Sequence, residues 1–195
     1  MNMRNMKTRK LTTMAMLAAL SIVLVWLIHF PIFPAAPYLE YDPADIPILI
    51  GTFAFGPVAG LLITVIAAVI QGVTVSAGSG FYGILMHVIA TGTFVAVAGG
   101  IYNRKKTRAS AALGLGCGVL AMTVVMVAAN LIVTPLFLGM PVSAVKGLIL
   151  PFIIPFNLIK AGVNGAVTFV LYKAVSRFIK SETSLTSTAR SSITR

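Results

Sequence analysis

The sequence contains few of the residues on which most enzymes and metalloproteins depend. Its 195 residues include four acidic side chains, two histidines and a single cysteine, Cys117. One cysteine excludes a disulfide framework and a cysteine-based zinc cluster. Neither a Ser/His/Asp set nor a metal-ligand spacing is visible, so a small intramembrane enzyme would lack its catalytic groups. We therefore expect a protein that is not an enzyme and that carries no cofactor.

Charge is absent from long stretches of the chain. No charged residue occurs between Ile46 and Asn103. Hydrophobic residues make up 58% of the sequence, and the mean hydropathy is +0.98. These values are typical of proteins that cross a membrane several times. The length suits one membrane bundle without an appended soluble domain.

The basic residues that produce the net charge of +11 lie mainly in three places. They precede the first apolar run, form the segment "NRKKTR" at 103–108, and follow the last apolar run. This is the bias of cytoplasmic loops rather than of a nucleic-acid-binding surface. We expect residues 1–10 to form a basic cytoplasmic N-terminus, residues 11–180 a membrane domain, and the Ser/Thr-rich residues 181–195 a flexible cytoplasmic tail.

Six apolar segments make up the membrane domain, separated by Gly56-Pro57, by "GVTVSAGSG" at 72–80 and by the charged loops. The expected helices are Leu11–Phe30, Ile46–Phe55, Pro57–Gln71, Phe81–Tyr102, Ala109–Leu138 and Pro151–Lys173. If the N-terminus and "NRKKTR" are both cytoplasmic, an even number of crossings separates them, so the short second segment is a helix of its own. The sequence predicts an all-α integral membrane protein: a bundle of six transmembrane helices with both termini cytoplasmic.

The loop before the short second helix contains most of the acidic residues. The segment "LEYDPADIP" at 39–47 includes Glu40, Asp42 and Asp45, with Tyr41 between them and prolines that stiffen the backbone. The predicted topology places this loop outside the cell. Two interpretations remain open: a solvated turn, or a rigid lid over a pocket.

Polar side chains also interrupt the last apolar segment. In "PFNLIKAGVNG" at 155–165, the spacing of Asn157, Lys160 and Asn164 places all three on one face of a helix. Asn130, on the preceding helix, is expected at the same external level. Buried polar groups need partners. They either hydrogen-bond one another, with Lys160 pairing to a carboxylate of the loop, or they line a pocket for a small polar and aromatic ligand.

Small residues gather in the first helix. Ala15 and Ala19 are spaced i, i+4, with Ala18 beside them, and such faces allow close helix–helix approach in membranes. Together with the segments above, "GTFAFGPVAGL", "SGFYGILMH" and Asn130 give the chain a recognisable pattern over about residues 10–180. It resembles the substrate-binding S components of energy-coupling factor (ECF) transporters, and among them the riboflavin-specific ones.

The resemblance implies a subunit of the prokaryotic plasma membrane that captures riboflavin outside the cell. It implies two kinds of partner, a transmembrane coupling subunit and two ABC-type ATPases, with Ala15, Ala18 and Ala19 docking on the coupling subunit. It implies ligand contacts from Leu39, Glu40, Tyr41, Asp42, Asn130, Asn157, Lys160 and Asn164. Another vitamin, FMN as ligand, and a self-sufficient carrier remain alternatives.

Overall fold

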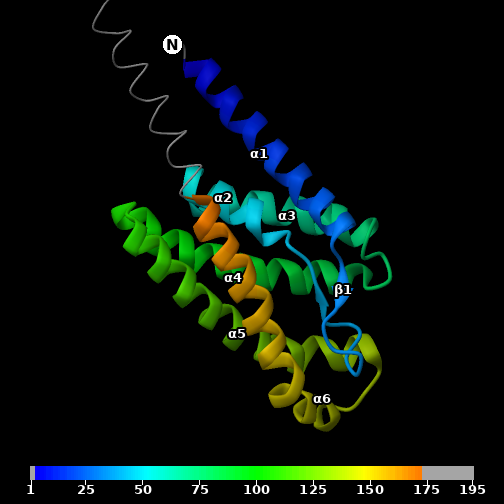
Figure 1. Ribbon diagram of the computed structural model, residues 1–195. Helices are drawn as coiled ribbons and strands as arrows, with labels where there is room; N and C mark the ends of the chain where they lie inside the picture. Colours follow the sequence, from blue (N-terminus) through cyan, green and yellow to red (C-terminus); the bar gives the residue numbers. More distant parts are fainter. Residues whose placement is uncertain (1–2, 173–195) are drawn as a thin grey trace, which may run out of the picture.

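The computed structural model describes residues 3–172, with side chains from Lys7 onward, and this part of the chain is almost entirely helical (Figure 1). The predicted tail at 181–195 lies outside the described residues. The elements in chain order are α1 (Met3–Leu27), β1 (Phe30–Pro31), β2 (Glu40–Tyr41), α2 (Asp45–Phe55), α3 (Pro57–Val73), α4 (Gly80–Lys105), α5 (Arg108–Leu138), α6 (Val142–Leu148), the π-helical turn η1 (Ile149–Ile153) and a final helix at 154–172.

Within the described residues each of the six predicted apolar segments forms a helix, although the first helix runs from Met3 to Leu27 rather than from Leu11 to Phe30, and Phe30 lies in β1. In the part of the chain that the structure describes, four helical stretches are long and apolar enough to cross a membrane: Lys7–Leu27, Gly80–Lys105, Arg108–Leu138 and Val142–Tyr172. The other two, α2 and α3, have 11 and 17 residues. At about 1.5 Å per residue, α2 covers roughly half of the hydrocarbon thickness. The described residues are therefore mostly helical and include four candidate spans, whereas six crossings remain a prediction.

The last helical stretch begins earlier than the sequence predicts, at Val142 rather than at Pro151. Proline has no backbone N–H and its ring clashes with the carbonyl four residues earlier, so it is uncommon in the interior of an α-helix. In the structure Pro151 lies inside η1 instead. The wider π-helical turn accommodates the proline without ending the helix.

A single residue joins the two short helices. Gly56 adopts φ 94° and ψ 168°, a backbone conformation that residues with a Cβ avoid, and Pro57 then opens α3. The helices are in close contact, because a Cβ at Gly60 would lie 2.0 Å from Thr52 Oγ1. The predicted break at Gly56-Pro57 is thus confirmed, and α2 is a separate helix packed on α3.

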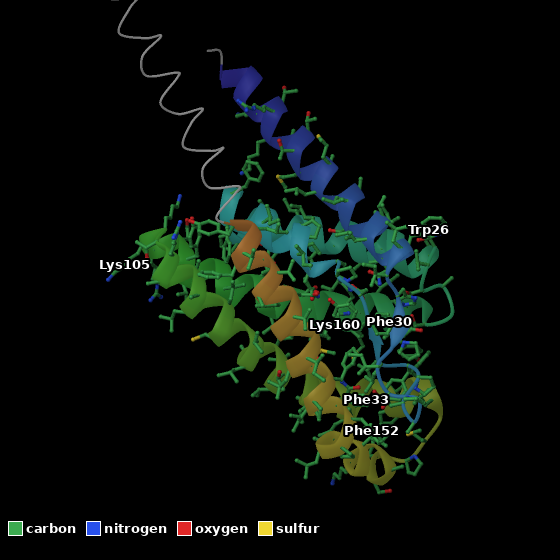
Figure 2. All side chains as sticks on the ribbon, in the orientation of Figure 1. Trp26, Phe30, Phe33, Lys105, Phe152 and Lys160 are labelled. Atoms are coloured by element: carbon green, nitrogen blue, oxygen red, sulfur yellow. The ribbon has the colours of Figure 1, made fainter. Side chains whose placement is uncertain are left out.

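The bundle has two ends of different character. The start of α1 and Lys105 lie at one end, whereas β1 and α6 lie at the other (Figures 1 and 2). We call residues 28–44, between α1 and α2, the lid loop. Its strands β1 and β2 pair antiparallel, with Phe30 opposite Tyr41. The two basic segments therefore share an end, as the charge pattern requires if both are cytoplasmic.

The orientation in the membrane can be tested by cysteine labelling of the exposed residues Ala35 and Lys105. In a Cys117→Ser background, Ala35→Cys should react with an impermeant maleimide in intact cells, and Lys105→Cys only after permeabilisation. The reason is that the basic segment should face the cytoplasm. Labelling of Lys105→Cys but not of Ala35→Cys in intact cells would reverse the topology.

Candidate functional site

The lid loop covers a cavity of about 450 Å³, which lies within the size range of small-molecule sites. α3, the α3–α4 turn, α4, α5 and the final helix supply the rest of its walls, and the lid loop contributes His29, Tyr38, Leu39, Glu40 and Asp42. Most of the remaining lining is apolar, including Met86, Met122, Met126, Val133 and Phe156. Such a cavity suits a largely apolar ligand that carries a few polar groups.

The lid loop is packed against the bundle rather than solvated. Ala36 and Leu39 are buried in a small apolar cluster with Val145, Ile153 and Phe156 from the last helical stretch. Figure 2 shows Phe33 of the loop beside Phe152, and their rings meet edge to face at 5.5 Å. The interpretation of residues 39–47 as a solvated turn is therefore wrong, and the loop forms a wall of the cavity.

A buried ion pair connects the lid loop to the final helix. Lys160 Nζ lies 2.7 Å from Asp42 Oδ2, and both side chains are buried (Figure 2 labels Lys160). The other carboxylate oxygen of Asp42 accepts a hydrogen bond from the backbone N–H of Ala44 at 3.0 Å. Burial tends to raise the pKa of Asp42, but the Lys160 ammonium outweighs it and holds that pKa below its usual value. The predicted pairing of Lys160 with a loop carboxylate is confirmed.

Tyr41 and Asn164 are predicted ligand contacts, but neither is among the residues that line the cavity. The Tyr41 hydroxyl donates to Asn164 Oδ1 at 3.0 Å. The Asn164 amide donates to the Asp42 carbonyl at 3.0 Å and to Asp45 Oδ2 at 2.9 Å. The second Asp45 oxygen accepts from the Thr91 hydroxyl at 2.6 Å. The polar groups of both residues thus fasten the lid loop to the bundle, and their contact with a ligand stays a prediction.

The two predicted asparagines of the cavity wall differ in how their amides are used. The nitrogen and the oxygen of the Asn130 amide are both paired within α5, since Nδ2 donates to the Met126 carbonyl and Oδ1 accepts from the Thr134 hydroxyl. Asn157 Nδ2 donates to the Ile153 carbonyl at 2.7 Å, but Asn157 Oδ1 has no partner. The alternative in which these asparagines bond one another across helices is not what the structure shows.

Four buried polar atoms of the described side chains lack a hydrogen-bond partner. They are Tyr38 Oη, Gln71 Oε1, His87 Nε2 and Asn157 Oδ1. All four residues line the cavity. A buried polar atom without a partner costs free energy, so atoms grouped around one cavity indicate that a polar ligand belongs there. The sequence reasoning found Asn157 alone.

Gln71 could have been found from the sequence. It is the single glutamine of the chain and lies within the uncharged stretch that starts at Ile46. An amide there needs a partner or a ligand, just as Asn157 does. It was missed because it occurs at the predicted end of a helix, where a polar residue is ordinary.

The three alanines of α1 are placed differently. Ala18 is buried in the bundle core, whereas Ala15 and Ala19 are exposed. Ala18 therefore presents no surface to a partner, and a docking face can include only the other two.

A mostly helical structure with several apolar candidate spans and a partly polar cavity is the arrangement expected of a membrane protein that binds a small molecule. Comparison with known proteins narrows this class. The family model for the substrate-specific component of ECF transporters matches residues 9–172. The chain therefore belongs to the family of ECF transporter substrate-specific components.

Individual relatives agree with this assignment. The chain is 34% identical to the riboflavin transporter RibU of Staphylococcus aureus (strain TCH60) over 150 residues, which cover 74% of this chain and 78% of that protein. It is 30% identical to the riboflavin transporter FmnP of Bacillus subtilis (strain 168) over 155 residues, which cover 75% and 82%. A solved structure of the S component of a bacterial ECF transporter matches with a TM-score of 0.78 and 34% identity, covering 89% of this chain and 99% of that one.

The Asp42–Lys160 pair makes a direct prediction about stability. Asp42→Asn leaves the buried Lys160 ammonium without its counter-ion, which should lower the free energy of unfolding by about 3–5 kcal/mol. The double variant Asp42→Asn/Lys160→Met removes both charges and should recover much of that loss. The measurement is unfolding of the purified, ligand-free protein in detergent.

Glu40→Gln is the matched control. Glu40 also lies on the lid loop, but it is partly exposed and pairs with His29 at 2.8 Å. Loss of such an exposed pair should cost at most about 1 kcal/mol. If Asp42→Asn and Glu40→Gln lowered the free energy of unfolding equally, burial would not increase the contribution of the Lys160–Asp42 pair to stability.

Proposed function

We propose that this chain is the subunit that captures riboflavin from outside the cell for an ECF-type importer. The observation that carries the proposal is the cavity under the lid loop, where the unpaired Asn157 Oδ1 and the Lys160 ammonium occur among apolar walls. The names of the relatives point to the same ligand. Riboflavin combines a large apolar ring system with a polar edge, and both features have counterparts in the cavity.

The polar edge of the flavin ring has carbonyl oxygens and one N–H. Lys160 Nζ can donate three hydrogen bonds and uses one for Asp42, so it can donate to a ring carbonyl. Asn157 Oδ1 can accept from the ring N–H. Asn130, Leu39, Glu40 and Asp42 complete the contacts. Tyr41 and Asn164 act indirectly, by holding the lid loop in place.

The cavity favours riboflavin over FMN. Lys160 is the one lysine or arginine among the residues that line the described cavity, and its charge is neutralised by Asp42. Glu40 adds a carboxylate to the same lining. A phosphate would meet no unpaired lysine or arginine there, and its desolvation would be uncompensated.

The transport role requires partners. The protein would lie in the plasma membrane of a prokaryote with both termini cytoplasmic. It would work with a transmembrane coupling subunit and two ABC-type ATPases. The exposed pair Ala15 and Ala19 on α1 is the proposed contact with the coupling subunit, because small side chains let a partner helix approach closely.

The ligand site is tested by flavin-fluorescence quenching. Asn157→Leu removes the unpaired acceptor, and Lys160→Met in an Asp42→Asn background removes the donor without leaving a buried carboxylate. Each loss leaves a polar atom of the ligand unpaired at a cost of about 1–3 kcal/mol, which is roughly tenfold to a hundredfold in Kd. Thr168→Val, in the same helix but outside the cavity lining, is the control. Wild-type affinity in the folded Asn157→Leu protein would exclude Asn157 from the site.

The docking surface is tested separately from ligand binding. Ala15→Trp and Ala19→Trp should leave riboflavin affinity unchanged and reduce uptake by the assembled transporter, because the bulky ring keeps a partner helix away. Leu20→Trp is the control: Leu20 is exposed on the same helix, about 100° around its axis from Ala19. If all three variants transport normally, α1 does not dock through these alanines.

A further inference from the structure

A second group of polar residues lines the cavity where α3 ends and turns into α4. Gln71 is 7% exposed, and Ser76 and Ser79 in the turn belong to the same lining. The Gln71 amide is oriented by its own Nε2, which donates to Ser76 Oγ at 3.4 Å. The Ser79 hydroxyl donates to the Ser76 carbonyl at 2.9 Å. Gln71 Oε1 is left without a partner.

The unpaired atoms of the cavity can be compared with what a flavin ring offers. Gln71 Oε1 and Asn157 Oδ1 are both acceptors, so each needs a donor. A flavin ring in its oxidised form has a single N–H group, which can satisfy one of them. The second acceptor therefore needs a donor from outside the ring, and the hydroxyls of a ribityl chain are such donors.

The other two unpaired atoms fit a polyhydroxylated chain equally well. The Tyr38 hydroxyl can donate or accept, and His87 Nε2 does one or the other according to its tautomer. A hydroxyl also donates and accepts. A chain of hydroxyls can thus pair with donors and acceptors alike. Each polar atom on the edge of a flavin ring, in contrast, either donates or accepts.

We propose that Gln71, oriented by Ser76, accepts a hydrogen bond from a hydroxyl of the ligand's ribityl chain. The wall formed by the end of α3 and the α3–α4 turn is then a polyol subsite, distinct from the ring-binding residues Asn157 and Lys160. This inference rests on the proposed function. Its consequence is specificity: the protein discriminates riboflavin from flavins that lack the chain.

The test compares riboflavin with lumiflavin, which has the same ring system and a methyl group in place of the ribityl chain. Wild-type protein should bind riboflavin about tenfold or more tightly than lumiflavin. Gln71→Met keeps the side-chain length and removes the acceptor. It should weaken riboflavin binding about 10- to 100-fold and leave lumiflavin binding unchanged.

Two controls separate this role from a structural one. Asn157→Leu should weaken both ligands by similar factors, because it removes a contact to the ring that they share. Unfolding of ligand-free Gln71→Met shows whether the variant is folded. The riboflavin-to-lumiflavin ratio of the wild type is an independent readout that needs no variant.

The results of these binding measurements can overturn either the polyol subsite or the proposed function. Equal affinity of the wild type for the two flavins overturns the polyol subsite, as does an unchanged riboflavin affinity in folded Gln71→Met. Equal weakening of both ligands by Gln71→Met makes Gln71 a structural residue and also rejects the proposal. Failure of the wild type to bind either flavin overturns the proposed function itself, and so is distinguishable from the other results.

Discussion

The ion pair between Lys160 and Asp42 is the interaction on which the cavity depends. Taking two charges out of water is costly, and the attraction compensates only when the geometry is good and the remaining groups are bonded. Here the distance is 2.7 Å and Asp42 also accepts from the Ala44 N–H. The pair joins residues 118 positions apart in the sequence, so it fixes the lid loop onto the final helix.

The surrounding hydrogen bonds extend this attachment. Asn164 bonds Tyr41, the Asp42 carbonyl and Asp45, and Asp45 also accepts from Thr91 of α4. The polar groups behind the cavity are thus mutually satisfied, whereas four that line the cavity are not. The satisfied groups hold the lid loop in place, whereas the unpaired ones are available to bind a ligand. Polarity alone does not make that distinction.

Much of the fold could be predicted from the sequence. The lack of charge between Ile46 and Asn103 and the break at Gly56-Pro57 located α2, α3 and α4, because apolar length and helix-breaking residues act locally. The spacing of Asn157 and Lys160 placed both on one face, and both line the cavity. Helical periodicity alone could not separate Asn164 from them, because the same face points partly at the cavity and partly at the lid loop.

Other features depended on contacts that no local pattern contains. Pro151 was read as a helix start, but the π-helical turn absorbs it within a longer helix. Ala18 was grouped with Ala15 and Ala19, yet packing against α2 and α3 turns Ala18 inward. Gln71 could not be singled out in this way, because what marks it is that its Oε1 atom lacks a hydrogen-bond partner. Such a property is visible only when all neighbouring side chains are placed.

The packing toward the Lys105 end of the bundle bears on how a ligand could cross the membrane. The Phe53 ring contacts that of Tyr102 in a tilted arrangement, with ring centroids 4.5 Å apart, and meets Tyr172 edge to face at 5.6 Å. The two tyrosine hydroxyls are 2.5 Å apart, so their polar ends satisfy one another. Together with the buried Phe94, these side chains belong to the apolar core of the described part of the bundle. Since protein cores pack densely, these side chains would have to move before a ligand could pass them. This packing favours the role of a substrate-specific component, the family to which the chain belongs, over that of a self-sufficient carrier.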